Sequence, residues 1–286
     1  MQLFVEHLTT IDSAYLHPEH GLVGESWIVD VALDGALDEA SMVMDFAHVK
    51  KRLKAAIDGS LDHVLIAPGR ARNLYISYSP PQGGSKTEDG VVIEWRFGKG
   101  EKLVHYSPKS AVALLDSENV TDLAMITYLE RVLAPVLPST VTRLGLTLRH
   151  ETTNDSYYHY VHGLKKHDGH CQRIAHGHRS RILIWRNGAR DLTLEAAWAA
   201  DWKTAYLGSR EDITGEHDGM INFAYDSGEG HFALSYPASR CRLLNTDSTV
   251  ELIAEHIAAT LKARDPAASF QVRAYEGVQK GAVAEA

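Results

Sequence analysis

A segment that occurs twice is the feature of this sequence that most constrains its fold. Residues 89–110 read DGVVIEWRFGKGEKLVHYSPKS, and residues 218–239 read DGMINFAYDSGEGHFALSYPAS. Each copy begins with Asp-Gly, has Gly-x-Gly near its middle and ends with an aromatic residue close to Pro-x-Ser. This pattern predicts the same β-hairpin in both copies. Two such hairpins with similar flanking sequence indicate that the whole surrounding unit is duplicated.

The similarity between the two halves extends beyond the hairpins. Helical apolar patterns follow at 117–133 and 246–261, and strand-like runs then end in Glu151 and Glu276. Before the hairpins, residues 26–33 and 181–185 have strand patterns, and residues 45–57 and 193–206 have helical spacing. The order strand, strand, helix, strand, strand, helix in each half predicts an α+β fold in which antiparallel sheets have helices packed on one face. With 286 residues, the chain is long enough for two domains, expected at 1–155 and 156–286.

Charge and composition exclude several classes of partner. A net charge of -8 and a pI near 6.0 argue against nucleic acid or an anionic membrane as the principal partner, because both require a basic face. The sequence has neither an apolar run long enough to span a membrane nor a leader-like start, so a cytoplasmic protein is expected. Its two cysteines, Cys171 and Cys241, are far apart and are expected to be reduced. Cys241, in an apolar context, is expected to be an incidental buried thiol.

Histidines are concentrated in one short stretch. Residues 157–185 contain six of the 16 histidines together with Cys171. His176 and His178 are two residues apart at the start of an apolar strand, so their side chains leave the same face and can share one metal ion. With His162 as third ligand, three neutral imidazoles and an open position give the arrangement of a catalytic zinc site. The alternative is a solvated histidine-rich surface loop that binds metal only incidentally.

Several short motifs resemble those of one enzyme family. His162-Gly163-Leu164, Cys171 and His176-Gly177-His178 resemble the H-x-L, Cys, H-G-H signature of the 6-pyruvoyltetrahydropterin and 6-carboxytetrahydropterin synthases. In the first half, residues 42–46 (MVMDF) resemble the family's M-V-x-D-F, and residues 61–63 (LDH) resemble its L-D-H. Glu151-Thr152 and Glu276 resemble the family's terminal E-T.

The resemblance implies a fold, a metal and a set of roles. It implies two tandem tunnelling-fold (T-fold) units and a zinc ion held by His162, His176 and His178. Proton transfer is assigned to Cys171, as general base, and to His63, oriented by Asp62. Either Glu276 or Glu151 is expected to hold the ring of a pterin substrate. Members of the family associate, so a homo-oligomer is also expected.

Each half of the sequence lacks family motif residues that the other half retains. Tyr15, Val23 and Glu25 occupy the first-half positions of the three zinc histidines, and the first half contains no cysteine. In the second half, Glu211 and Asp212 replace Asp62 and His63. The complementary loss predicts composite sites built from both units, within one chain or between chains. Alternatively, Asp62 and His63 only form a helix-terminal turn with a satisfied core histidine.

The resemblance also suggests a reaction. The Cys-x4-HGH spacing differs from the Cys-x3-HGH that is usual in bacterial 6-carboxytetrahydropterin synthases and from the longer spacer of animal 6-pyruvoyl enzymes. A microbial-looking composition and a compact loop favour conversion of 7,8-dihydroneopterin triphosphate to 6-carboxy-5,6,7,8-tetrahydropterin, a step toward queuosine. The alternatives are 6-pyruvoyltetrahydropterin synthase, another lyase or epimerase acting on a pterin side chain, and a non-catalytic zinc- or pterin-binding paralogue. The metal is inferred, because imidazole sites also accept iron, nickel or copper.

Overall fold

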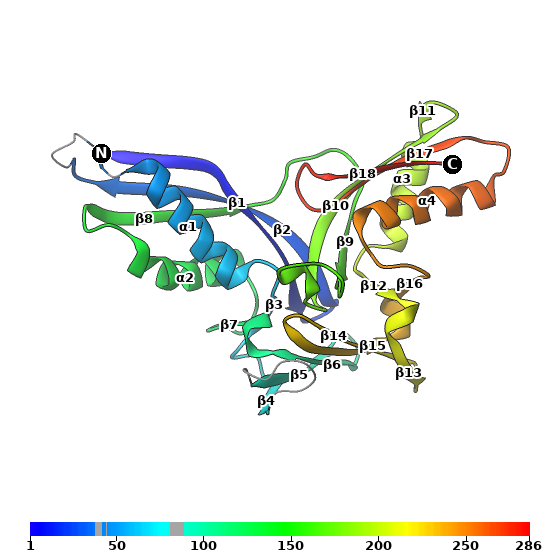
Figure 1. Ribbon diagram of the computed structural model, residues 1–286, viewed down its shortest axis with the longest axis horizontal. Helices are drawn as coiled ribbons and strands as arrows, with labels where there is room; N and C mark the ends of the chain where they lie inside the picture. The colour runs from blue at the N-terminus through cyan, green and yellow to red at the C-terminus, as the bar shows by residue number, and fades with distance from the viewer. Residues whose placement is uncertain (38–41, 44, 81–88) are drawn as a thin grey trace.

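The computed structural model describes residues 1–37, 42–43, 45–80 and 89–286. In Figure 1 the described chain forms two wings that meet at the centre, with a third sheet below them. The first wing has the strand order β7-β3-β1-β2-β8, and α1 and α2 pack on one face of it. Its elements in chain order are β1 (Gln2–His17), β2 (Gly21–Gly35), α1 (Phe46–Leu61), β3 (Leu65–Pro68), β7 (Val112–Leu115), α2 (Asp122–Leu133) and β8 (Val141–Arg149).

The second wing repeats this arrangement. Its strand order is β16-β12-β9-β10-β17-β18, with the short β11 paired to β10, and α3 and α4 pack on one face. Its elements are β9 (Tyr157–His162), β10 (His176–Arg186), β11 (Ala189–Arg190), α3 (Leu192–Asp201), β12 (Ala205–Ser209), β16 (Cys241–Leu244), α4 (Val250–Arg264), β17 (Phe270–Tyr275) and β18 (Gly281–Glu285). Each wing has its own apolar core between sheet and helices.

The duplicated hairpins join to form the third sheet. Its order is β13-β14-β15-β6-β5-β4, and β6 pairs with β15 in antiparallel register, with His105 opposite Leu234. Trp95 and Phe223 lie in one buried cluster with residues of both wings, such as Ala14 and Val161. The hairpin sheet therefore ties the two units together. Its strands are β4 (Leu74–Ser79), β5 (Gly90–Phe97), β6 (Glu101–Pro108), β13 (Ile213–His217), β14 (Met220–Ser227) and β15 (Gly230–Pro237).

The predicted α+β fold with two tandem T-fold units is confirmed, and the main differences lie at helix ends. The helices expected from 117 and 246 begin later because Thr121 and Thr249 are their N-caps. The Thr121 hydroxyl accepts the N–H of Ala124, and the Thr249 hydroxyl accepts that of Leu252. The helix expected to run to 206 ends at Asp201, because β12 begins at Ala205.

The inner hairpins of the two units have matching registers. In the first unit Tyr15 pairs with Val23, and in the second His162 pairs with His176. Three residues earlier on the first strand of each hairpin lie Asp12 and His159, and the register is again the same. The predicted correspondence between Tyr15 and His162 therefore follows from the pairing itself.

The units meet where β2 and β10 approach each other at two glycines. A Cβ atom on Gly24 would lie 1.9 Å from the Tyr160 carbonyl oxygen and 2.6 Å from the His178 nitrogen. A Cβ atom on Gly177 would lie 2.6 Å from the Gly24 Cα. These neighbours are backbone atoms, so neither position can accept a side chain unless the units separate. The close approach of the two units therefore requires a glycine at position 177, the central residue of His-Gly-His.

Met44 of the MVMDF segment lies outside the described residues. The boundary near residue 155 falls in the connection between β8 and β9 and stays a prediction. None of the described helices has the length and apolarity needed to cross a bilayer.

Gly24→Ala should destabilise the protein more than an equivalent change elsewhere in the same sheet. The added methyl group would collide with the backbone of β9 and β10, and overpacking of this kind costs about 1–3 kcal/mol or more. Urea unfolding of both variants would measure the change. Gly145→Ala in β8 is the matched control, since its nearest neighbour would be Ala32 Cβ at 3.6 Å. Equal unfolding midpoints for the two variants would contradict the proposed close contact.

Candidate active site and metal centre

Three buried imidazoles converge at the start of β10. His162 ends β9 and lies opposite His176, while His178 lies two residues further along the same face of β10. The three are at most 1% exposed, and one ring nitrogen from each lies within 4.8 Å of the others. The structure therefore brings together the three histidines that the sequence indicated as metal ligands.

An oxygen atom faces the outer ring nitrogen of each imidazole. His162 Nδ1 donates to the Ser248 carbonyl at 2.9 Å, and His176 Nδ1 donates to the Arg173 carbonyl at 2.9 Å. His178 Nδ1 lies 3.3 Å from Asp12 Oδ1. The inner Nε2 atoms of His178 and His162 are 3.2 Å apart. The two carbonyl oxygens orient the rings of His162 and His176, and a carboxylate faces His178; outer oxygens of these kinds are typical of a catalytic metal site, so this donor set fits zinc or a similar ion.

Burial keeps two of these imidazoles neutral. It lowers the pKa of His162 and of His176 well below the usual histidine value, and neighbouring histidines lower both further. Neutral imidazole is the form that ligates a metal.

Asp12 is a buried carboxylate at this site and comes from the first unit. Burial by itself raises its pKa, but His178, Lys280 and a hydrogen bond from the Ser26 hydroxyl outweigh burial and hold the pKa far below the usual value. Lys280 Nζ lies 3.3 Å from Asp12 Oδ2. Asp12 is therefore ionised and supplies negative charge behind His178.

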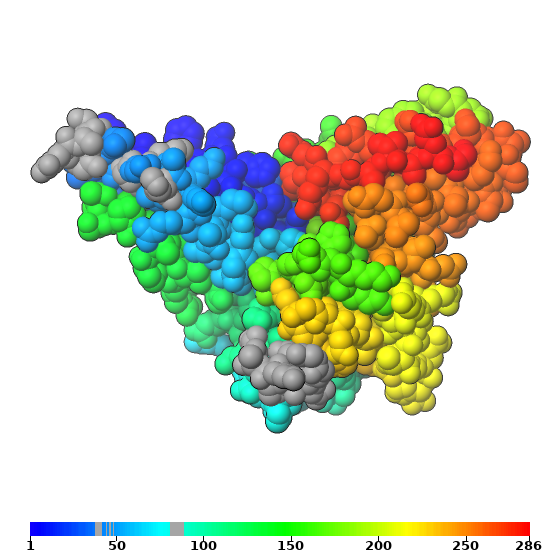
Figure 2. All heavy atoms as spheres, in the orientation of Figure 1, coloured from blue at the N-terminus to red at the C-terminus, as the bar shows by residue number. Residues whose placement is uncertain are grey.

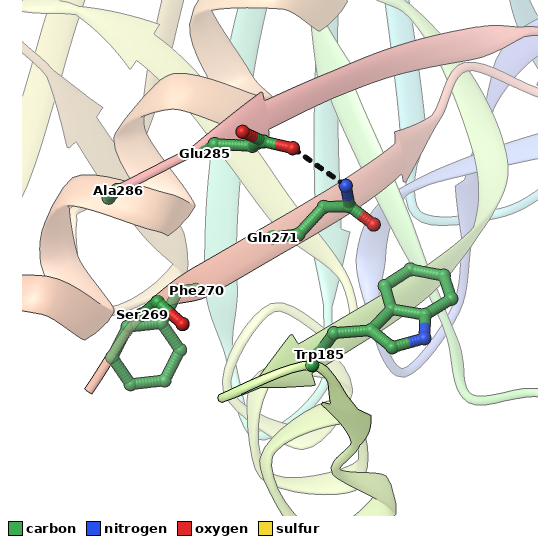
Figure 3. A pocket seen from close by; sticks show the side chains of 7 residues that line it. Trp185, Ser269, Phe270, Gln271, Glu285 and Ala286 are labelled. Carbon is green, nitrogen blue, oxygen red and sulfur yellow. Dashed lines mark hydrogen bonds between the residues drawn. The ribbon is translucent and has the colours of Figure 1, made fainter.

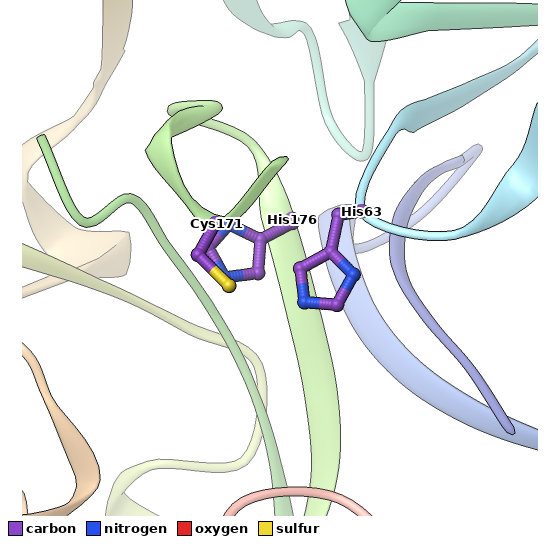
Figure 4. Close-up of side chains that lie close together, drawn as sticks. All are labelled: His63, Cys171 and His176. Atoms are coloured by element: carbon purple, nitrogen blue, oxygen red, sulfur yellow. The ribbon is translucent and has the colours of Figure 1, made fainter. Parts of the chain in front are cut away.

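Asp62 and His63 of the first unit reach the same place. His63 Nδ1 lies 2.8 Å from Asp62 Oδ2, and potential ligand atoms of His63, Cys171 and His176 lie within 4.8 Å of one another. Figure 4 shows the Cys171 sulfur and the two rings turned toward a common space, with His63 on the segment opposite β10. The composite arrangement thus forms within one chain.

The environment of His63 favours its protonated form. Burial lowers its pKa, but hydrogen bonds to Asp62 and Cys171 outweigh that effect and raise the pKa to about 10. The backbone of His63 is in the left-handed region with φ of 55°, which is uncommon for a residue with a side chain. Its N–H donates to the Asp12 carbonyl at 3.0 Å, and the Asp12 N–H donates to Asp62 Oδ1 at 2.8 Å. Asp12 therefore fixes this turn as well as facing His178.

The two candidate glutamates lie on different sides of β10. Glu151 pairs with Arg181, with Nε and Oε2 2.9 Å apart, and the Arg181 side chain leaves the face of β10 opposite to His176 and His178. Glu276 precedes Gly277, whose N–H donates to Ser180 Oγ at 3.2 Å, and Ser180 shares the face of His178. Glu276 is therefore adjacent to the composite site, and Glu151 is not.

The counterpart positions in the first unit hold a different group. Glu25 lies where the second unit has His178, and its carboxylate lies 3.3 Å from His150 Nδ1 and 3.5 Å from His159 Nδ1. In the second unit Glu211 and Asp212, the counterparts of Asp62 and His63, both pair with Lys165. Glu25 thus contacts two histidines, whereas Glu211 and Asp212 form ion pairs with Lys165.

Comparison with known proteins gives the relationship. A sequence model described as 6-pyruvoyl tetrahydropterin synthase matches residues 7–74 and 151–286. The chain belongs to this family. Members of the family are lyases that bind pterins, typically depend on a metal ion and form oligomers. None of the curated proteins matches the sequence.

Solved structures of the same family share a limited likeness with this chain. The 6-pyruvoyltetrahydropterin synthase of Plasmodium vivax is 18% identical, with a TM-score of 0.37, and the match covers 52% of this chain and 97% of that chain. The Plasmodium falciparum enzyme is 14% identical, with a TM-score of 0.38 and the same coverage. Each of these chains matches about half of the present one.

Other features lie apart from this site. Cys241 is buried as expected, burial raises its pKa to about 12, and its thiol donates to the Pro237 carbonyl. A pocket over the neighbouring strands β10, β17 and β18 is lined by Trp185, Gln271 and Glu285 (Figure 3). It lies about 23 Å along β10 from His178, at roughly 3.3 Å per residue, and is unrelated to the imidazoles. Figure 2 shows a notch where the surfaces of the two wings meet.

Sequence reasoning missed Asp12, Ser248 and Lys280. Asp12 lies within a long strand and Ser248 shortly precedes a helix, so each looks like an ordinary residue of its element. Lys280 could have been noticed, because it lies only four residues after Glu276 in the terminal motif.

Replacing Asp12 should weaken zinc binding. Asp12→Asn removes the charge 3.3 Å from His178, and loss of such an outer partner typically lowers metal affinity about 10–100-fold. Competition with a chromogenic chelator would measure the affinity. Asp226→Asn is the matched control, because Asp226 pairs with the ring of His231 at 2.9 Å at an exposed position. Equal zinc affinity in the two variants would show that Asp12 does not support His178.

Proposed function

We propose that this protein is a zinc-dependent pterin synthase that converts 7,8-dihydroneopterin triphosphate to 6-carboxy-5,6,7,8-tetrahydropterin, a step toward queuosine. The observation that carries the proposal is the meeting of Asp62 and His63 from the first unit with Cys171 and three imidazoles from the second. Neither unit contains this set by itself. We propose that the units are residues 1–155 and 156–286, and that chains associate as homo-oligomers.

The proposed chemistry begins with removal of a proton from the substrate side chain. Zinc, when held by His162, His176 and His178, acts as a Lewis acid that stabilises negative charge developing on a substrate oxygen. Cys171 Sγ accepts the proton from the adjacent carbon as general base. His63 donates a proton from the ring nitrogen that faces Cys171, while Asp62 holds the other nitrogen.

Glu276 is the proposed anchor of the pterin ring. A carboxylate can accept two N–H donors from the aminopyrimidinone edge in a bidentate, charge-assisted contact. The next residue, Gly277, lies beside Ser180 and Asp12, which supports Glu276 over Glu151, whose carboxylate already pairs with Arg181.

The reaction itself is the first test of this proposal. Metal-analysed protein incubated with 7,8-dihydroneopterin triphosphate should release triphosphate and acetaldehyde and yield 6-carboxytetrahydropterin, which mass spectrometry would identify. Cys171→Ala and His63→Ala should each lower kcat about 10²–10⁴-fold, the usual contribution of a positioned acid or base.

Cys241→Ala is the matched control for the thiol and should keep both zinc and activity, since Cys241 lies in the core away from the imidazoles. A 6-pyruvoyl product would assign the protein to the sister activity. Bound zinc without turnover of this or related pterins would favour a binding protein.

The two glutamates can be separated by kinetics. Glu276→Gln should raise KM for the pterin about 10–100-fold, because a hydrogen bond to a charged group contributes about 1.5–3 kcal/mol. Glu151→Gln should leave KM nearly unchanged. The opposite ranking would place the pterin on the other face of β10.

A further inference from the structure

The segment that carries Cys171 lies between two strands and is not itself part of a sheet. Cys171 lies in a single 3₁₀ turn, His170–Gln172, between β9 and β10. The Cys171 carbonyl accepts the N–H of Leu164 at 2.9 Å. A side chain that must stay beside His63 of the other unit requires further support.

That support comes from the turn between β14 and β15. The carboxylate of Glu229, in this turn, contacts His170 Nδ1 through Oε1 and accepts Arg173 Nε at 2.8 Å through Oε2. The Glu229 N–H donates to Gln172 Oε1 at 3.2 Å. One residue of the hairpin sheet thus binds the chain on both sides of Cys171.

Arg173 extends this contact to both units. Its side chain is 6% exposed, and its Nη1 donates to the His63 carbonyl at 3.4 Å. Its own carbonyl accepts the Nδ1 proton of the proposed metal ligand His176. Arg173 therefore contacts the segment that carries His63, belongs to the loop that carries Cys171, and contacts the proposed metal ligand His176.

The alternative role for Arg173 is binding a phosphate of the substrate. The guanidinium is buried, and Glu229 already neutralises it through a charge-assisted contact. A buried arginine whose charge is already paired binds an anion from solvent only weakly. Its hydrogen bonds run to protein groups around Cys171.

We propose that Arg173, held by Glu229, is a positioning residue that fixes the Cys171 loop against His63. This inference rests on the proposed function, because it assigns Cys171 and His63 to proton transfer. It adds the hairpin turn to the catalytic machinery, although Glu229 belongs to a different sheet from the imidazoles.

The test compares two conservative variants. Glu229→Gln keeps size and polarity but loses the charge, and Arg173→Lys keeps the charge but loses the planar fork that reaches Glu229 and His63 at once. Each should lower kcat about 10–100-fold, the cost of misplacing a reacting group by about 1 Å. KM and zinc stoichiometry should be unchanged.

A second readout does not depend on turnover. Iodoacetamide alkylation of Cys171 at pH 7, located by peptide mass, should change several-fold in rate when the loop no longer holds the thiol beside His63. A purely structural contact would lower the unfolding midpoint without changing this rate.

The hairpin sheet offers a matched control. Arg240 and Glu101 form a similar pair, with Nη2 and Oε2 2.6 Å apart, that does not involve the Cys171 loop. Glu101→Gln and Arg240→Lys should leave kcat and the alkylation rate unchanged. Alkylation of the Glu229 and Arg173 variants at the control rate would overturn the proposal.

The outcomes also separate this proposal from the proposed function. If the unaltered protein turns over no pterin, the proposed function fails, while the alkylation rates still decide whether Arg173 positions Cys171. If Arg173→Lys does not fold, Glu229→Gln provides both readouts.

Discussion

The backbone contact between β2 and β10 is the constraint on which the rest of the molecule depends. Gly24 and Gly177 allow two strands from different sheets to touch without side chains between them. Because the strands touch there, Asp12 reaches His178, and the turn that carries Asp62 and His63 reaches Cys171. A gap between β2 and β10 as wide as one side chain would move the site residues of the first unit away from those of the second.

The hairpin sheet makes this contact independent of assembly. Pairing of β6 with β15 joins an element of each unit in one hydrogen-bonded sheet, and the core beneath it contains apolar residues of both units. Burial of a shared apolar core is a strong stabilising contribution. One covalent chain therefore holds Asp62 and His63 of the first unit beside Cys171 of the second.

Much of this arrangement could be predicted from the sequence, because it depends on patterns that lie within short segments. The duplicated Asp-Gly hairpins, the spacing of His176 and His178 and the exchange of Asp62-His63 for Glu211-Asp212 are visible in single segments. Asp12 could not be found in this way. Its role comes from a neighbour 166 residues away in sequence, and its strand pattern is unremarkable.

The choice between Glu151 and Glu276 likewise depends on which face of β10 each glutamate approaches. The contact of Glu229 with Arg173 depends on which loop the turn between β14 and β15 approaches. Such relations are fixed by packing between distant elements. The sequence alone can narrow them to a few residues, as it did for the glutamates, but a three-dimensional structure is needed to choose among those residues.

The two carboxylate–imidazole contacts at the junction have a consequence for which units can associate. Asp12 and Glu25 belong to the first unit, and their partners His178 and His159 belong to the second. Matching registers place Asp12 and His159 at equivalent positions, and likewise Glu25 and His178. Two first units joined in this way would bring Asp12 against Glu25, and two second units would bring His159 against His178. The junction therefore discriminates by charge against two first units, whose carboxylates would meet, and two second units would lack the carboxylates that face these imidazoles. The contact thus selects the union of unlike halves.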